Sequence, residues 1–209
     1  MKSALLLVDL QNDFCQGGAL AVAEGDATIT IANQMMAWCK KKDVAVVASQ
    51  DWHPAKHRSF AANSHTEAWT VGELNGLPQV WWPVHCVQNE PGAEFHPALE
   101  IKRLDFVVQK GTNMDIDSYS AFYDNGHLAA TMLNDWLKAA KISHLYVMGL
   151  ATDYCVKFTV LDALAQGYKV TLLTDSCRGV NLEPQDSDEA IKAMQLAGAK
   201  VSTSAAVLG

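Results

Sequence analysis

Ala4-Leu5-Leu6-Leu7-Val8-Asp9 is the stretch of sequence that decides the fold. Five apolar residues in succession, without the alternation of a half-exposed strand, predict a strand buried on both faces, as in a parallel sheet. The apolar run then ends at an aspartate. Because open α/β sheets bind ligands at the carboxyl ends of their strands, this aspartate is the first candidate for a functional residue.

Further apolar runs of strand length, rich in Val, Leu and Tyr, recur along the chain. They cover residues 44–48, 106–108, 145–148 and 170–174, with a weaker run at 200–203. Amphipathic stretches with helical spacing lie between them, at residues 27–41, 128–140, 153–165 and 185–196. Strands that alternate with helices are typical of a parallel sheet with right-handed crossovers. The pattern predicts an α/β fold, a three-layer α/β/α arrangement with a six-stranded, mainly parallel sheet.

One long segment, residues 52–98, breaks this alternation. It has no convincing periodicity, yet it holds four of the six Trp, five of the seven His and five of the six Pro. A connection this long is usually functional or disordered, and the density of Trp and His argues against disorder. We therefore expect a single domain over residues 1–209, with an inserted, ordered, pocket-forming excursion at about residues 52–98.

The composition argues against several classes of partner. Sixteen basic and 23 acidic residues give a net charge of −7, and the one basic run is Lys40-Lys41-Lys42. Nucleic-acid binding needs concentrated positive charge, and a membrane span needs roughly 20 consecutive apolar residues. The sequence therefore predicts neither a nucleic-acid partner nor a membrane partner. A monomer and a homo-oligomer both remain open.

The cysteines indicate a reducing compartment. They are scattered, odd in number and never form a C-x-x-C pair: Cys15, Cys39, Cys86, Cys155 and Cys177. This pattern argues against a disulfide framework. The apolar run at residues 4–8 is also interrupted too early for a secretory signal. We therefore expect a cytoplasmic location.

Chemically active side chains follow the predicted strands at their carboxyl ends. Asp9 follows the first strand, Asp51 and His53 the second, Lys110 the third, and Cys155 lies a few residues after the fourth. Because parallel strands end at the same edge of a sheet, we expect these side chains to converge. Together they would supply an acid/base group, metal ligands, a cation and a thiol.

Cys155 is the candidate nucleophile. It follows a glycine-containing turn, Gly149 to Tyr154, that leads from a strand into a helix. The positive end of the helix dipole favours a thiolate there, and free N–H groups can hold an oxyanion. Asp9 is the expected proton acceptor, and Lys110 the cation that holds both groups in their charged forms. A buried structural cysteine, an aspartate in a turn and a surface lysine are the alternatives.

Asp51-Trp52-His53-Pro54 is the candidate metal motif. Residues two apart on an extended backbone project to the same face, so Asp51 and His53 can reach one ion. His85 is the expected third ligand, and His57 is the reserve. One carboxylate and two imidazoles leave positions open for water or substrate, as catalytic metal sites do. A purely structural role for each histidine is the alternative.

Aromatic residues lie near these motifs in sequence: Phe14, Trp52, Trp82, Tyr119 and Tyr123. Stacking against a flat aromatic substrate would explain them. For any single one, packing in the core or in a lid is the alternative.

Taken together, the motifs resemble the nicotinamidase/pyrazinamidase family of isochorismatase-like cysteine hydrolases, whose fold is Rossmann-like. The matching segments run from the first strand to the last helix: residues 5–14, 49–54, 82–88, 110–111 with 117–122, 147–156 and 174–179. As a set these motifs are highly specific, because the Asp, Lys and Cys occur together with an intact set of metal ligands.

The resemblance implies roles for the matched residues. The family's catalytic triad is matched by Asp9, Lys110 and Cys155. Its metal ligands are matched by Asp51, His53 and His85. The implied cofactor is one divalent metal, in the first place zinc, with iron or manganese in some relatives. A further histidine ligand that some relatives use is not matched by His57, and Ser59 is expected beside the ligands.

The resemblance also implies how a substrate is held. The Leu150–Ala151 peptide matches a cis bond in the family, which would direct the N–H groups of Ala151 and Cys155 at the oxyanion. Phe14 and Trp82 match the aromatic residues that sandwich the substrate ring, and we place Tyr119 and Tyr123 in the same substrate-binding group.

The activity that the resemblance implies is hydrolysis of nicotinamide to nicotinic acid and ammonia through a cysteine thioester, in NAD salvage, with pyrazinamide also accepted. A related cysteine amidase acting on an N-carbamoyl or ureido substrate is the first alternative, and the intact metal ligands argue against it. A non-catalytic metal or thiol sensor is the second, and it would have no need for Lys110.

Overall fold

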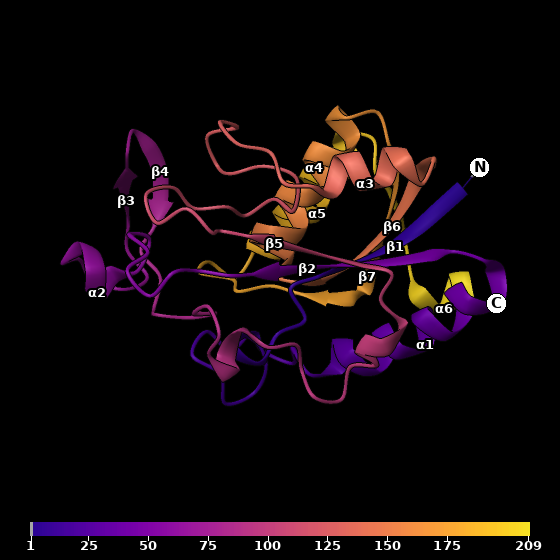
Figure 1. Ribbon diagram of the computed structural model, residues 1–209, viewed down its shortest axis with the longest axis horizontal. Coiled ribbons are helices and arrows are strands. Elements are labelled where there is room, and N and C mark those ends of the chain that lie inside the picture. Colours follow the sequence, from indigo (N-terminus) through magenta and orange to yellow (C-terminus); the bar gives the residue numbers. More distant parts are fainter. Residues whose placement is uncertain (1) are drawn as a thin grey trace.

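The computed structural model describes residues 2–209 and has one large sheet between two layers of helices (Figure 1). The strands of this sheet are β1 (Lys2–Val8), β2 (Ala45–Asp51), β5 (Phe106–Lys110), β6 (Ile142–Leu150), β7 (Lys169–Arg178) and β8 (Lys200–Ser202). They lie in the order β5-β2-β1-β6-β7-β8, and every neighbouring pair is parallel. The predicted six-stranded α/β fold is confirmed, and this sheet is parallel throughout.

The strand order reverses at β1. From β1 the chain builds β2 and β5 toward one edge of the sheet, then crosses back to add β6, β7 and β8 on the other side. Such a reversal leaves a crevice outside the carboxyl ends of the two strands where the order turns, here β1 and β6. The topology therefore places a ligand site beyond Val8 and Leu150.

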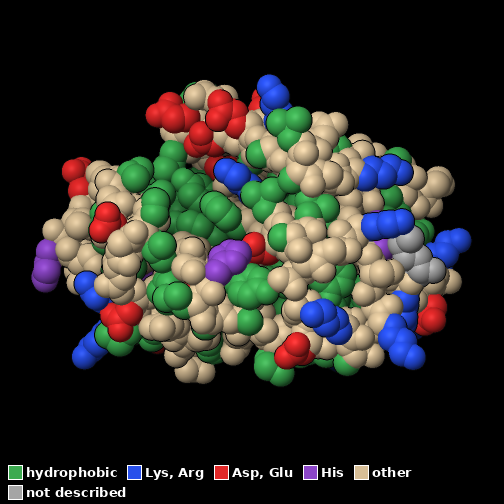
Figure 2. Space-filling model, turned by 90° about the horizontal axis from the view of Figure 1, so that it is seen from above, with side chains coloured by type: hydrophobic (Ala, Val, Ile, Leu, Met, Phe, Trp, Pro, Cys, Tyr) green, Lys and Arg blue, Asp and Glu red, His purple; other side chains and the backbone are tan. Residues whose placement is uncertain are grey.

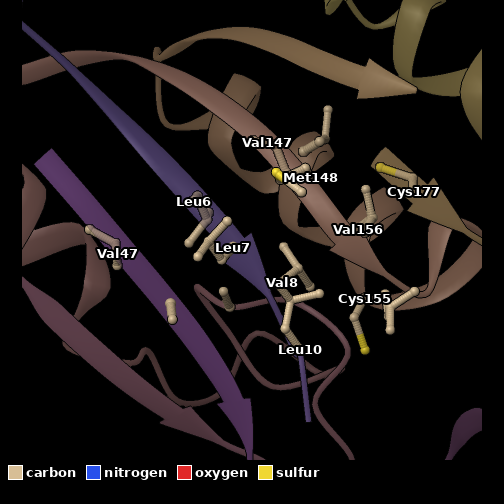
Figure 3. Packing of buried hydrophobic residues seen from close by; sticks show 14 of the residues in the cluster. Leu6, Leu7, Val8, Leu10, Val47, Val147, Met148, Cys155, Val156 and Cys177 are labelled. Carbon is tan, nitrogen blue, oxygen red and sulfur yellow. The ribbon is translucent and has the colours of Figure 1, made fainter. Parts of the chain in front are cut away.

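The central strand is as buried as its sequence predicts. Leu5, Leu7 and Val8 have no exposed surface, and Leu6 is 1% exposed. In Figure 3 the side chains of β1 lie among those of β2 and β6, and Cys155 lies close to Val8 and Leu10 at the end of this core. The apolar run thus positions the crevice as well as the sheet.

Helices cover both faces of the sheet. The helices are α1 (Ala27–Lys42), α2 (Ala61–Ser64), α3 (Leu133–Ala139), α4 (Lys157–Ala165), α5 (Asp186–Leu196) and α6 (Ser204–Leu208). Short helical turns are η1 (Asn12–Phe14), η2 (Pro91–Ala93), η3 (Ile101–Arg103) and η4 (Thr152–Val156). In Figure 1, α1 and α6 lie on one face, and α3, α4 and α5 lie on the other. No helix within residues 2–209 has the length and hydropathy that crossing a membrane requires.

Charge is unevenly distributed over the surface. On the face shown in Figure 2, many of the Lys and Arg side chains gather toward the end of the molecule where the termini lie in Figure 1. Lys2, Lys169 and Lys200 begin strands β1, β7 and β8, so they lie at the amino edge of the parallel sheet. The crevice lies at the opposite edge.

Two of the predicted helices begin later than their sequence patterns suggest. The stretch 128–132 is not helical, because Asp124 accepts hydrogen bonds from the N–H groups of Leu128 and Ala129, and Thr131 donates to the carbonyl of Ala121. The start of the predicted helix 153–165 is the π-turn η4, closed by a bond from the Val156 N–H to the Ala151 carbonyl. Only the second difference, at η4, lies beside the crevice, because Cys155 of η4 lines the pocket there.

The excursion at residues 52–98 holds more regular structure than its sequence pattern predicts. It includes α2 and an antiparallel hairpin of β3 (Val71–Leu74) and β4 (Leu77–Val80). Asn75 and Gly76 connect the two strands with φ of 51° and 81°. Positive φ at both turn residues is what a two-residue hairpin connection needs, and Asn-Gly is the usual sequence for it.

Candidate active site

The ends of the strands bring the predicted polar residues together. Asp51 and Lys110 are the last residues of β2 and β5 and face each other in the register of the sheet. Asp9 directly follows β1, and Cys155 lies in η4, after β6. The convergence expected from the strand order is therefore present in the structure.

Lys110 lies at the centre of this cluster and is 2% exposed. Its Nζ is 2.7 Å from Oδ1 of Asp51, 3.0 Å from Oδ2 of Asp9 and 3.3 Å from Sγ of Cys155. It also donates to the carbonyl of Ser118 at 2.9 Å. Burial disfavours the charged ammonium, but Asp51 and Asp9 outweigh it and raise the pKa of Lys110 well above its usual range. The lysine is a fixed positive charge.

Asp9 is arranged as a base. Its φ of 50° lies in the left-handed region, which residues other than glycine seldom adopt and which is enriched at active sites. Oδ1 accepts a hydrogen bond from Ser49 Oγ at 2.6 Å, and a carboxylate oxygen lies within 4.8 Å of the sulfur of Cys155. Complete burial raises the pKa of Asp9 although Lys110 acts to lower it. A carboxylate of raised pKa takes a proton more readily than one in water.

Cys155 keeps its proton in the resting site. Burial raises the pKa of the thiol well above its usual range; Lys110 lowers it, and the carboxylates of Asp9 and Asp51 raise it. The thiolate expected at the start of a helix is therefore not the resting form here, because desolvation and two carboxylates outweigh one ammonium. Activation of this sulfur requires transfer of its proton to Asp9.

The backbone before Cys155 takes an unusual path. The peptide between Leu150 and Ala151 is cis. Gly149, with φ of 130°, lies so close to β1 that a Cβ there would be 2.2 Å from the carbonyl oxygen of Val8. Glycine is required at this position because any side chain would collide with that backbone. Ala151 and Cys155 line the same pocket, and their N–H groups remain the predicted oxyanion hole.

Three predicted metal ligands form a second, adjoining cluster. Asp51, His53 and His85 are all buried, and one ligand atom from each lies within 4.8 Å of the others. Oδ2 of Asp51 is 3.3 Å from Nε2 of His53 and 3.6 Å from Nε2 of His85. Two imidazoles and one carboxylate are a usual donor set for zinc and similar divalent metals.

The hydrogen bonds of the two histidines fit a metal. Nδ1 of His53 lies 2.9 Å from the carbonyl of Gly111, and Nδ1 of His85 lies 2.8 Å from that of Pro83. A carbonyl only accepts, so each Nδ1 carries the proton, and the neutral ring would offer the lone pair of Nε2 to a metal bound at Asp51. Gly111 permits this contact, since a Cβ there would be 2.4 Å from the His53 ring.

His57 and Ser59 lie beside this cluster. His57 packs against His53 with ring centroids 4.4 Å apart. Its Nε2 donates to the carbonyl of Ile116, and its Nδ1 accepts from Ser59 Oγ at 2.7 Å. Burial and His53 lower the pKa of His57 to about 4, so the ring is neutral. His57 is not in the group of the three predicted ligands, but its ligand atom lies within 4.8 Å of those of His53 and Asp117, so it stays the reserve ligand.

A narrow pocket lies over the thiol. Its volume is about 20 Å³, and it is lined by Phe14, Leu20, Asp51, Trp82, His85, Asp117, Tyr119, Ala151, Tyr154, Cys155 and Val180. The structure thus brings Phe14, Trp82 and Tyr119 to the thiol and the metal ligands. Their rings form an aromatic wall opposite the charged cluster, as a flat aromatic ligand requires.

Tyr123 is not part of this pocket. Its hydroxyl accepts a hydrogen bond from Gln166 Nε2 at 2.6 Å, and its ring stacks on His127 with centroids 4.7 Å apart. The loop after Phe122 turns away from the crevice toward α3 and carries Tyr123 with it. The structure therefore does not bring Tyr123 together with the other predicted substrate-binding residues. Trp52, also considered for stacking, does not line the pocket either.

Sequence reasoning missed four residues of the pocket wall: Leu20, Asp117, Tyr154 and Val180. Tyr154 directly precedes Cys155, and this position next to the nucleophile in a helical turn is the sequence feature that could have identified it. Asp117 lies in a segment of the recognised family pattern; its Oδ2 accepts from Gln79 Nε2 at 2.8 Å and its Oδ1 from the Ser118 N–H at 2.8 Å. Leu20 and Val180 carry no sequence signal.

Comparisons with known proteins agree with this geometry. A model of the isochorismatase domain matches residues 3–206. The chain is 60% identical over 200 residues to the nicotinamidase of Escherichia coli (strain K12). The aligned residues cover 96% of this chain and 94% of that protein. A nicotinamidase/pyrazinamidase structure from Acinetobacter baumannii superposes with a TM-score of 0.93 at 42% identity, covering 99% and 98% of the two chains. The pyrazinamidase of Pyrococcus horikoshii in complex with zinc superposes with a TM-score of 0.81 at 36% identity. The superposition covers 97% of this chain and 99% of that chain.

Proposed function

The chain belongs to the isochorismatase family, and we propose that it is the nicotinamidase of its cell, which hydrolyses nicotinamide to nicotinic acid and ammonia in NAD salvage. The observation that carries the proposal is the position of Lys110, whose ammonium contacts the base Asp9, the thiol of Cys155 and the metal ligand Asp51. An amidase that needs a thiol and a metal side by side is the function that this arrangement supports best.

Formation of the thioester begins at Asp9. Asp9 takes the proton of Cys155, and the sulfur attacks the carboxamide carbon. The oxyanion that forms is held by the N–H groups of Ala151 and Cys155. When the proton moves from the sulfur to Asp9, the negative charge moves from the carboxylate to the sulfur. The ammonium of Lys110 contacts both groups and therefore stabilises the negative charge on either one. Asp9 then returns the proton to the amide nitrogen, the C–N bond breaks and ammonia leaves.

Hydrolysis of the thioester uses the same groups in reverse roles. A water molecule takes the place of ammonia, Asp9 accepts one of its protons, and the oxygen attacks the thioester carbon. The C–S bond breaks, the carboxylic acid is released, and the proton held by Asp9 returns to the sulfur. The site is then restored, with no oxidant or reductant consumed.

Asp51, His53 and His85 would hold one divalent metal, and we propose zinc. When bound, the metal supplies a Lewis acid that positions a ring nitrogen of the substrate. Phe14 and Trp82 hold the two faces of the ring. Pyrazinamide carries a nitrogen at the same ring position, so the same site accepts it. The cytoplasmic location remains part of this proposal.

An ammonia-release assay tests the proposed function. Purified protein is given nicotinamide, pyrazinamide or N-carbamoylsarcosine, each with and without a chelator, and metal content is measured in parallel. We expect release from the two ring amides, loss of activity with chelator and recovery on adding zinc. Release from N-carbamoylsarcosine alone, independent of chelator, would favour the ureido amidase instead.

A further inference from the structure

The pocket over Cys155 has a wall of aromatic rings: Phe14, Trp82, Tyr119 and Tyr154. Which of these rings also borders the solvent decides how a substrate reaches the thiol.

Tyr154 is the least restrained aromatic residue of that wall. The hydroxyl of Tyr119 accepts from Trp82 Nε1 at 3.3 Å and from Gln79 Nε2 at 3.4 Å, which fixes Tyr119 and Trp82 to each other. Tyr154 is only half-buried, and its hydroxyl has no hydrogen-bond partner in the part of the chain that the structure describes. Its ring meets the rings of Trp82 and Tyr119 edge to face, with ring centroids 4.8 Å and 5.3 Å apart.

An open groove lies directly behind this ring. It has a volume of about 460 Å³ and runs between the hairpin strand β4, the start of α4 and the helix α5. Tyr119 and Tyr154 line both this groove and the pocket over the thiol. The two rings are therefore the partition between the groove and the thiol.

The groove carries an excess of negative charge near the partition. Asp153, Asp186 and Glu189 line it, against the one cation Lys157. Burial, Asp153 and Asp186 raise the pKa of Tyr154 to about 12, so its hydroxyl stays neutral. A neutral amide meets no electrostatic barrier here, whereas a carboxylate does.

We propose that substrate enters from the groove past the partition at Tyr154, and that the acidic rim of Asp186 and Glu189 selects for the neutral amide and against return of the carboxylate product. The inference rests on the proposed function and deepens it. It assigns the residue that controls substrate access to the thiol and the charged residues that disfavour re-entry of the product.

Substitutions of Tyr154 test the partition. Tyr154→Phe keeps the ring and is the matched control, so its ratio of kcat/KM for quinoline-3-carboxamide to that for nicotinamide should equal the ratio of the unmodified protein. Tyr154→Ala should raise kcat/KM for the larger quinoline-3-carboxamide, relative to nicotinamide, by about tenfold, because the ring that blocks access is gone. An unchanged ratio in Tyr154→Ala, with the thermal melting point retained, would overturn the assignment of Tyr154.

Substitutions on α5 test the acidic rim. The double variant Asp186→Asn with Glu189→Gln should bind nicotinate about threefold more tightly as a product inhibitor at low salt, and the difference should fade at about 0.5 M salt. KM for neutral nicotinamide should stay within about twofold. The matched control, Glu183→Gln with Asp188→Asn, removes the same charge from residues outside the groove and should leave nicotinate binding unchanged.

The outcomes separate this inference from the proposed function. If the unmodified protein releases no ammonia from nicotinamide, the proposed function fails and this inference fails with it. The unmodified protein can be active while both double variants change nicotinate inhibition equally. In that case the effect of removing negative charge does not depend on its position in the groove, and only the inference about the rim is overturned.

Discussion

Asp51 and Lys110 end neighbouring parallel strands as register partners, and the Asp51 carboxylate faces two clusters at once. Its Oδ1 accepts a hydrogen bond from Lys110 at 2.7 Å, while its Oδ2 faces Nε2 of His53 and of His85. Burial disfavours the carboxylate, but Lys110 and His53 outweigh it and hold the pKa of Asp51 well below its usual range. One aspartate therefore joins the thiol site to the metal ligands.

The first prediction concerns the buried charges around Lys110. Lys110→Met leaves Asp9 and Asp51 without their cation and should lower the free energy of unfolding at pH 7 by about 3 kcal/mol. The loss should shrink as the pH falls and the two carboxylates take up protons. Urea unfolding monitored by circular dichroism measures both effects. The control Lys138→Met, at an exposed lysine, should change stability by less than about 0.5 kcal/mol; equal stability of the two variants would contradict the account.

The second prediction concerns the base. Asp9 acts in its unprotonated form, so kcat/KM should fall as the pH drops through its pKa, which burial raises. The hydrogen bond from Ser49 lowers that pKa, so Ser49→Ala should move the acid limb of the pH profile to higher pH. Ser49→Thr keeps a hydroxyl and serves as the control. An acid limb that stays in place or moves to lower pH in Ser49→Ala would exclude Asp9 as the group that titrates.

The third prediction separates the metal ligands from the histidine beside them. His85→Ala removes a nitrogen that faces Asp51 and should weaken metal binding by at least about 100-fold. His57→Ala should weaken it by less than about tenfold, since both ring nitrogens of His57 already have partners. Chelator competition and metal analysis by mass spectrometry give the two affinities. Equal losses in both variants would mean that His57 is a ligand after all.

The fourth prediction concerns the thiol. Cys155→Ala removes one buried sulfur atom and should reduce kcat by at least about 10⁴-fold, as loss of a nucleophile does. The thermal melting point and the metal content should stay close to those of the unmodified protein, because the thiol is neither a ligand nor a major packing group. Cys177→Ala, at another buried cysteine, is the control and should retain activity.

The sheet and most of the site could be predicted from the sequence because they depend on strand polarity. An unbroken apolar run such as residues 4–8 predicts a doubly covered strand, and parallel strands bring the residues after them to one edge. The positions of Asp9, Asp51 and Lys110 follow from that rule alone. His85 depends in addition on the path of the excursion, which no periodicity describes.

Other features depend on contacts that sequence patterns do not encode. Tyr123 turns away from the pocket because Asp124 and Thr131 fix the loop that follows it. The protonated state of Cys155 results from burial beside two carboxylates, which a helix-start argument leaves out. The role of Tyr154 as a wall appears only once the π-turn η4 is seen to lie between the pocket and the groove.

Mass spectrometry of the acid-quenched reaction tests the central claim most directly. The protein is mixed with nicotinamide, quenched within the first turnover, digested and analysed for modified peptides. The account predicts a nicotinoyl group on the peptide that holds Cys155, absent from Cys155→Ala and lost from the unmodified protein as substrate is consumed. Full ammonia release with no adduct at Cys155, or by the Cys155→Ala variant, would contradict it.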